Sequence, residues 1–150
     1  MKVNFILFLI IAVLIIAIDQ SVKRYYLKKY GLNTTYALKN KRFRIYVVKN
    51  EGAFLGLGRK HPLIVLIVSI ILAFILFIYC LVADEILLKK VMLIVMAGGA
   101  VSNIIDRVAR RGVIDYLSIQ IGRKRIIANL ADFFIFSSAV IYLILNIFYK

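Results

Sequence analysis

The sequence predicts an all-α membrane protein of one domain, 1–150, in which four transmembrane helices carry a small β-sheet at the membrane surface. Of the 150 residues, 63% are hydrophobic and 19% are charged, and the mean hydropathy is +0.94. A soluble globular domain is nearer to half apolar and a quarter charged. The apolar residues gather into four runs about as long as a bilayer-crossing helix. This composition excludes an ordinary soluble enzyme and a disordered chain.

The four helices are expected at about residues 3–26, 63–83, 87–105 and 126–148. The first begins as an apolar run that is short for a span, and Asp19 and the residues after it continue the helix into the interface. A secretory signal peptide is the alternative for this segment. No small-residue cleavage site follows the run, so we expect the helix to be retained.

Two segments between these helices have the alternating pattern of half-buried strands. Residues 42–48 alternate polar and apolar side chains, and residues 117–121 do the same before a turn that begins at Gly122. With four spans, both segments lie on the same side of the bilayer. The pattern therefore predicts a small sheet that pairs them beside the ends of the third and fourth helices.

The charge balance is strongly basic, with 21 Lys and Arg against 7 Asp and Glu, a net charge of +14. In a chain this apolar, lipid headgroups are a better match for that charge than nucleic acid. Most of the basic residues lie in the two long connections. The positive-inside rule would place these connections in the cytoplasm, although the rule is weak for segments that fold as domains.

Few acids remain, and four of them lie at the ends of apolar runs or in the third connection. These are Asp19, Asp106, Asp115 and Asp132. An ionisable group in or near a span costs free energy. A single such residue is explained by a helix-end ion pair. Several that converge on one side of the membrane, with amides beside them, indicate a functional site.

Spacing within the helices groups these acids with polar partners. Asp19 and Lys23 are four residues apart and share a helix face, so they can form an ion pair. The pairs Asn103/Asp106 and Asn129/Asp132 are each three residues apart, which places an amide beside a carboxylate.

Asp115 and Asp132 are the candidates for a catalytic pair. Each lies in an apolar patch without an adjacent Arg, whereas Asp106 is followed by Arg107 and is expected to be structural. Two carboxylates held close together cannot both ionise easily, so one keeps its proton. The charged one can then deprotonate a water while the neutral one polarises a carbonyl, which is the chemistry of aspartic proteases.

Five short motifs occur in order along nearly the whole chain. They are Asp19-Gln20-x-x-Lys23, Asn50-x-Gly52-Ala53, Gly98-Gly99-Ala100-x-x-Asn103-x-x-Asp106-Arg107, Val113-Ile114-Asp115-Tyr116 and Asn129-x-Ala131-Asp132. At these residues the sequence resembles lipoprotein signal peptidase, or signal peptidase II, a family of bacterial membrane aspartyl proteases. One such motif carries little weight, but five in order on a four-helix chain of this length are specific.

The resemblance implies a multi-pass protein of the bacterial inner (cell) membrane, with both termini cytoplasmic and an extracytoplasmic β-sheet cradle. It implies that Asp115 and Asp132 are the catalytic dyad. Residues expected to orient the dyad or hold the peptide are Asn50, Asn103, Arg107 and Asn129, and those expected to support the site are Asp19, Lys23 and Asp106.

The reaction that the resemblance implies is removal of the signal peptide from a prolipoprotein, just before a Cys that already carries diacylglyceryl. Prolipoproteins, membrane lipids and globomycin-type inhibitors are then the expected partners, with no nucleic acid. No cofactor or metal is expected, and the single His61 and single Cys80 agree with this because neither can form a metal cluster alone.

The chain departs from the family's pattern at a few positions. Ser102 stands where Gly is usual, Ala128 where Phe is usual, and Tyr116 where the motif has Phe. The first two departures affect the expected substrate range and pocket shape more than the chemistry. Two other functions remain as alternatives, a small proton-coupled transporter that uses the same acids and a catalytically silent scaffold that binds lipoproteins.

Overall fold

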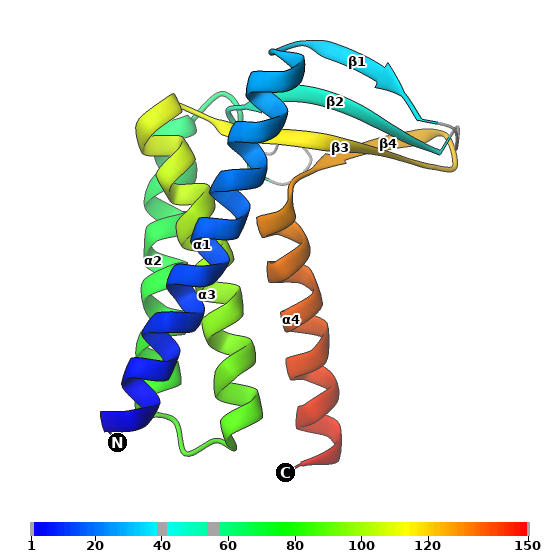
Figure 1. Cartoon of the computed structure of the whole chain (residues 1–150). Helices are drawn as coiled ribbons and strands as arrows, with labels where there is room; N and C mark the ends of the chain where they lie inside the picture. Colours follow the sequence, from blue (N-terminus) through cyan, green and yellow to red (C-terminus); the bar gives the residue numbers. More distant parts are fainter. Residues whose placement is uncertain (1, 39–41, 54–57, 150) are drawn as a thin grey trace.

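The computed structural model describes residues 2–38, 42–53 and 58–149 and contains four long helices capped by one sheet (Figure 1). The helices are α1 (Lys2–Tyr30), α2 (Pro62–Val82), α3 (Leu87–Arg110) and α4 (Leu130–Phe148). All four are long and apolar enough to cross a membrane. Many of their large apolar side chains point outward, such as Val82 and Phe136, which are 74% and 71% exposed. The protein is a multi-pass membrane protein with the predicted fold class.

The sheet has four antiparallel strands in the order β1-β2-β3-β4. They are β1 (Thr34–Ala37), β2 (Phe43–Asn50), β3 (Val113–Ile121) and β4 (Lys124–Ala128). Both expected strands are present as β2 and β3, and each gains an outer neighbour. The β2–β3 register shifts between Ile45 and Val48. Such an irregularity bends the strand and changes the direction of the side chains that follow it. Asn50, the last residue of β2, is one of these side chains.

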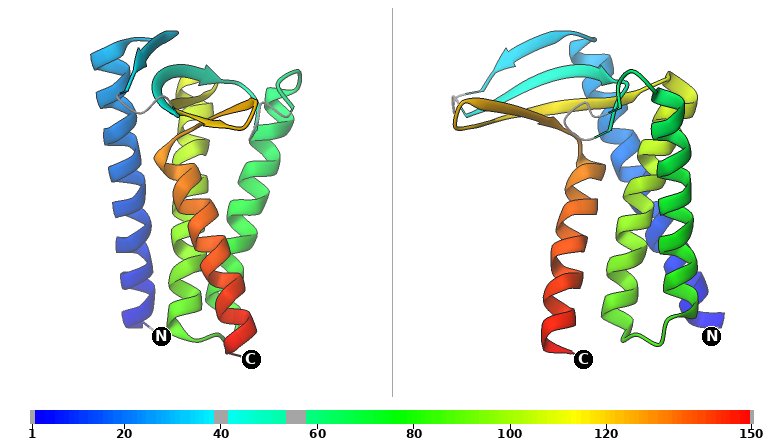
Figure 2. Two further views of the ribbon diagram at one scale, coloured as in Figure 1. Left: turned by 90° about the vertical axis from the view of Figure 1, so that its right-hand side faces the viewer. Right: turned by 180° about the vertical axis from the view of Figure 1, so that it is seen from behind.

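The sheet lies across one end of the helices, and both termini lie at the other end (Figures 1 and 2). Tyrosines of α1 join the helix to the sheet. The ring of Tyr26 stacks on that of Tyr116 from β3, with centroids 4.3 Å apart. Val47 and Ile114 pack into the same buried cluster. These contacts hold the strands against the end of the bundle that lies opposite the two termini.

Helix α3 lies at the centre of the bundle and packs against the other three helices. Gly98 and Gly99 allow this close approach. A Cβ at Gly98 would lie 3.2 Å from Ile15 of α1, and one at Gly99 would lie 2.9 Å from the Ala131 carbonyl of α4. Small residues bring helix backbones close together in membranes. The small-residue stretch thus lets α3 approach the middle of α1 and the first turns of α4 closely.

Three helix limits differ from the sequence expectation. Helix α1 continues to Tyr30 and α3 to Arg110, whereas α4 begins at Leu130 and not near residue 126. The later start of α4 has a clear cause, because residues 124–128 pair with β3 as β4. Single-sequence periodicity does not separate an apolar strand from an apolar first helical turn.

Candidate active site

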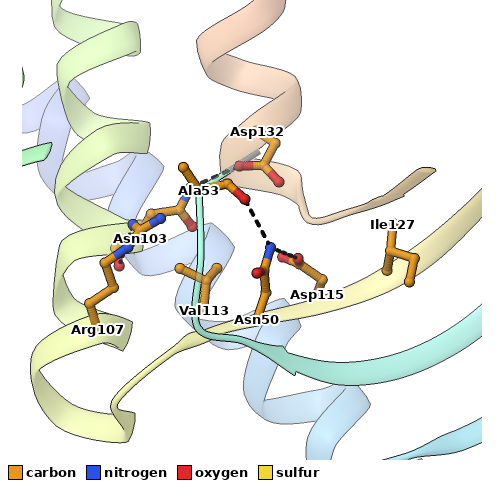
Figure 3. A pocket seen from close by; sticks show the side chains of 8 residues that line it. All are labelled: Asn50, Ala53, Asn103, Arg107, Val113, Asp115, Ile127 and Asp132. Atoms are coloured by element: carbon orange, nitrogen blue, oxygen red, sulfur yellow. Dashed lines mark hydrogen bonds between the residues drawn. The ribbon is translucent and has the colours of Figure 1, made fainter. Parts of the chain in front are cut away.

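A small cavity lies where β2 and β3 meet the ends of α3 and α4, and the side chains of Asp115 and Asp132 both line it (Figure 3). Its other lining residues are Asn50, Ala53, Asn103, Arg107, Val113 and Ile127. The cavity has a volume of about 20 Å³, which is enough for one water molecule. Residues distant in the sequence are thus brought together around a space of the right size for a hydrolytic water.

Asp115 lies in β3 and is 2% exposed. Its Oδ1 accepts a hydrogen bond of 2.7 Å from the Asn129 amide, and its Oδ2 accepts one of 3.1 Å from the Asn50 amide. Burial, together with the charge of Asp132, raises the pKa of Asp115 to about 7. This carboxyl group therefore keeps its proton below about pH 7 and is partly protonated at neutral pH.

Asp132 lies in the first turn of α4 and forms a capping box with Asn129. The Asn129 side chain accepts from the Asp132 backbone N–H at 2.9 Å, and the Asp132 carboxylate accepts from the Asn129 N–H at 3.3 Å. Its Oδ1 also accepts a bond of 2.9 Å from the Asn103 amide. Within the part of the chain that the structure describes, neither Asp115 nor Asp132 forms an ion pair.

A fully buried ionic cluster lies behind Asn103. The Lys23 ammonium is 2.7 Å from Asp19, 2.9 Å from Asp106 and 2.8 Å from the Asn103 side-chain oxygen. An ammonium group only donates hydrogen bonds, so it holds the oxygen of the amide and turns the NH₂ group the other way. That NH₂ group donates to Asp132. Lys23 thus sets the orientation of the amide that holds Asp132.

Two residues without an assigned role complete this cluster. Ser102 donates to Asp19 at 2.6 Å, and Gln20 donates to the Ser102 hydroxyl and to Asp106, each at 3.1 Å. Gln20 belongs to a quoted motif, and Ser102 is one of the departures from the family's pattern. The sequence offered a signal for both positions but none for their contact with each other.

Asp106 forms ion pairs in the buried cluster, but Arg107 is not its partner. Arg110, one turn further along α3, pairs with Asp106, which also binds Lys23. Arg107 donates instead to the backbone carbonyl of Gly52 at 3.3 Å, and its side chain lines the cavity. Adjacent residues of a helix point in different directions, whereas residues four apart share a face.

The i, i+3 amide–acid pairs also have different outcomes. Asn129 and Asp132 cap each other, because the helix begins between them. Asn103 does not bind Asp106, since its two amide atoms are used by Lys23 and Asp132. The candidate residues are otherwise brought together: five line the cavity directly, namely Asn50, Asn103, Arg107, Asp115 and Asp132.

The remaining four candidates lie immediately behind this lining, and they are Asp19, Lys23, Asp106 and Asn129. Among the described residues, no group of three or more His, Cys, Asp or Glu side chains could hold a metal ion. Of the apolar lining residues, Ala53 and Val113 belong to the quoted motifs, whereas Ile127 was not anticipated, because an apolar residue in a strand carries no signal of its position beside a site.

Comparison with known proteins agrees with this geometry. The family model described as signal peptidase (SPase) II matches residues 11–149. The chain is 32% identical to the lipoprotein signal peptidase of Syntrophus aciditrophicus, with 100% of this chain and 97% of that protein covered, and 30% identical to that of Clostridioides difficile, with 96% and 97% covered.

Among solved structures, the fold is similar to that of a bacterial membrane enzyme with a TM-score of 0.80 and 26% identity. The similarity covers 94% of this chain and 87% of the other. The motifs, the four spans, the paired acids and these matches all lead to one assignment. The chain belongs to the signal peptidase II family of aspartic proteases.

Proposed function

We propose that this protein is an intramembrane aspartyl endopeptidase that cleaves the signal peptide from prolipoproteins immediately before a diacylglyceryl-modified Cys. Family membership supports signal-peptide removal from prolipoproteins. One observation carries the aspartyl mechanism: Asp115 and Asp132 line the same water-sized cavity, and each is held by amide donors and by no cation in the described chain.

Asp115 and Asp132 divide the work of peptide hydrolysis in this proposal. Asp115, with a pKa of about 7, carries the proton and donates it to the scissile carbonyl oxygen. Asp132 is ionised and takes a proton from the water, whose oxygen bonds to the carbonyl carbon. When the C–N bond breaks, Asp132 returns its proton to the amine, and Asp115 recovers one from the collapsing diol. One water is consumed and both carboxyl groups end as they began.

Asn50 and Arg107 are placed to hold the peptide. Asn50 accepts from the Gly52 N–H at 3.0 Å and donates to Asp115, so it joins the loop after β2 to the dyad. The Nε atom of Arg107 is buried and has no hydrogen-bond partner among the described residues. Because an unpaired buried donor is costly, we propose that it donates to a backbone carbonyl of the bound signal peptide.

The proposed location is the bacterial inner membrane, with both termini in the cytoplasm and the sheet at the outer face. The exposed basic side chains at the sheet end, such as Arg59, Arg123 and Lys124, then contact anionic lipid headgroups. The positive-inside rule favours the reverse orientation. Labelling of single cysteines at Arg123→Cys and Asp84→Cys in a Cys80→Ser background decides it, since only the outer site reacts with an impermeant reagent.

The test of the activity is cleavage of a diacylglyceryl-modified prolipoprotein by the reconstituted protein, with and without globomycin. Asp115→Asn and Asp132→Asn should each reduce the rate by at least about 10³-fold, the scale seen when an essential member of a catalytic group is removed. Asp84→Asn is the matched control, because Asp84 is exposed at the opposite end of the bundle. Full activity in either dyad variant contradicts the proposal, and globomycin should block the wild-type protein.

A further inference from the structure

The first turn of α4, which carries Asp132, has a side-chain acceptor for each of its free backbone amides. A helix leaves its first N–H groups without helical partners. Here the amides of residues 129 and 132 are used by the capping box. The Ala131 N–H donates to Asp19 of α1 at 2.8 Å, and the Leu130 N–H donates to the Tyr116 hydroxyl of β3 at 3.0 Å.

The last of these contacts joins the two proposed catalytic elements directly. Tyr116 follows Asp115 in β3, and Leu130 is the first residue of α4, two residues before Asp132. The bond from Leu130 to Tyr116 therefore fastens the helix that carries one carboxylate to the strand position next to the other. Among the described residues, no other β3 side chain accepts a hydrogen bond from a backbone N–H of this turn.

The hydroxyl that receives this bond has little freedom to move. The Tyr116 ring is 7% exposed and stacks on Tyr26 of α1 with ring planes 6° apart. Tyr26 in turn stacks on Tyr30, at 5.8 Å between centroids. Burial raises the pKa of Tyr116 above its usual value, so the group remains a neutral phenol. The acceptor is thus placed by α1 and β3 together.

We propose that the Tyr116 hydroxyl is a positioning group for the proposed peptidase, which sets the spacing of Asp115 and Asp132 by holding the Leu130 N–H. This inference rests on the proposed function, because positioning matters only if the two carboxylates act together. A Phe at this position would supply the ring but no acceptor.

The first experiment compares Tyr116→Phe with Tyr26→Phe in the reconstituted protein. Both changes remove one hydroxyl and keep the ring stack, but only the Tyr116 hydroxyl accepts a hydrogen bond from the first turn of α4. We expect kcat of Tyr116→Phe to fall about tenfold with KM unchanged, because small displacements of reacting groups lower the rate strongly. Tyr26→Phe should keep the wild-type kcat. Equal kcat values in the two variants overturn the proposal.

Removing the donor tests the same bond from its other end. Leu130→Pro deletes the N–H at the first helical position, where Pro is tolerated. Asn129 is already extended, with φ −124° and ψ −179°, which is the conformation that a following Pro requires. In the Leu130→Pro background, Tyr116→Phe should have no further effect on kcat. Independent, multiplied losses in the double variant contradict the inference.

A measurement that does not depend on activity separates this inference from the proposed function. Amide hydrogen exchange at residue 130 should be faster in Tyr116→Phe than in the wild type and in Tyr26→Phe. If the wild type cleaves no prolipoprotein but this difference is seen, the function fails and the contact stands. If cleavage is normal and neither kcat nor exchange changes, the positioning role is wrong. Should Tyr116→Phe yield no folded protein, Leu130→Pro alone decides.

Discussion

Among the side chains that the structure describes, one lysine is buried at each end of the helical bundle, and the two lysines have different surroundings. At the sheet end, Lys23 is fully buried and contacts Asp19, Asp106 and Asn103. At the opposite end, Lys89 is 5% exposed. It lies 2.9 Å from Glu85 and donates to the Asn146 side chain at 2.9 Å and to the Tyr149 carbonyl at 2.8 Å.

The contacts of the Lys89 cluster all lie among residues at its own end of the bundle. Its acid, Glu85, also accepts from the Tyr142 hydroxyl at 3.3 Å, and the lysine charge lies at the C-terminal end of α4, where a helix dipole favours a cation. The Lys23 cluster instead continues through Asn103 to Asp132 and so to the cavity. Lys89 joins two helix ends, whereas Lys23 orients the amide that binds Asp132, and neither acid of the pair forms a salt bridge among the described residues.

The largest effect should come from removing the Lys23 charge. Lys23→Met leaves Asp19 and Asp106 buried without this partner, which costs about 3–5 kcal/mol for a broken buried pair, and it releases Asn103. We expect a lower Tm and a loss of cleavage of about 100-fold or more. Lys89→Met should lower the Tm but keep the activity within about twofold. A similar loss of activity in both variants would contradict the different roles that we assign to Lys23 and Lys89.

The second effect isolates the amide from the charge. Asn103→Ala removes the donor to Asp132 and leaves both ion pairs of Lys23, so we expect a rate about 10- to 100-fold lower with a modest fall in Tm. Asn146→Ala removes the corresponding amide beside Lys89. Its rate should equal that of the wild type. If Asn103→Ala is also fully active, Asp132 does not depend on this amide, and the Lys23 cluster is structural only.

The smallest effect is a shift in pH dependence. Asp115 titrates near pH 7, so the rate should fall as the pH rises through that value and the group loses its proton. The hydrogen bond from Asn50 favours the charged form and lowers the pKa. Asn50→Ala should therefore move the alkaline limb of the kcat/KM profile to higher pH, while Asn146→Ala leaves it in place. A shift to lower pH contradicts this assignment.

The same pKa shift affects stability with a definite sign. The folded state holds the Asp115 proton up to about pH 7, whereas an unfolded Asp releases it near pH 4. The folded state binds more protons in this window, so the contribution of Asp115 to stability is fully present below about pH 4 and is lost as the pH rises towards 7. Thermal unfolding of the wild type and of Asp115→Asn over this range measures the difference.

The sequence by itself determined the features that depend on neighbouring residues. The four apolar runs indicate four spans because a bilayer requires helices of that length. The Asp19–Lys23 pair and the placement of Asn129 beside Asp132 follow from spacing along the chain, which puts residues three or four apart side by side. The capping box itself was not predicted, because the helix was expected to begin near residue 126. The motif positions identified all nine candidate residues before their arrangement was known.

Only the tertiary structure decided which distant groups meet. Arg110 and not Arg107 pairs with Asp106, Asn103 faces Lys23 and Asp132, and Tyr116 holds the first turn of α4. The physical reason is that these contacts depend on how α1, α3, α4 and the sheet approach one another. That approach is set by Gly98, Gly99 and the bulge in β2, and local spacing carries no information about it.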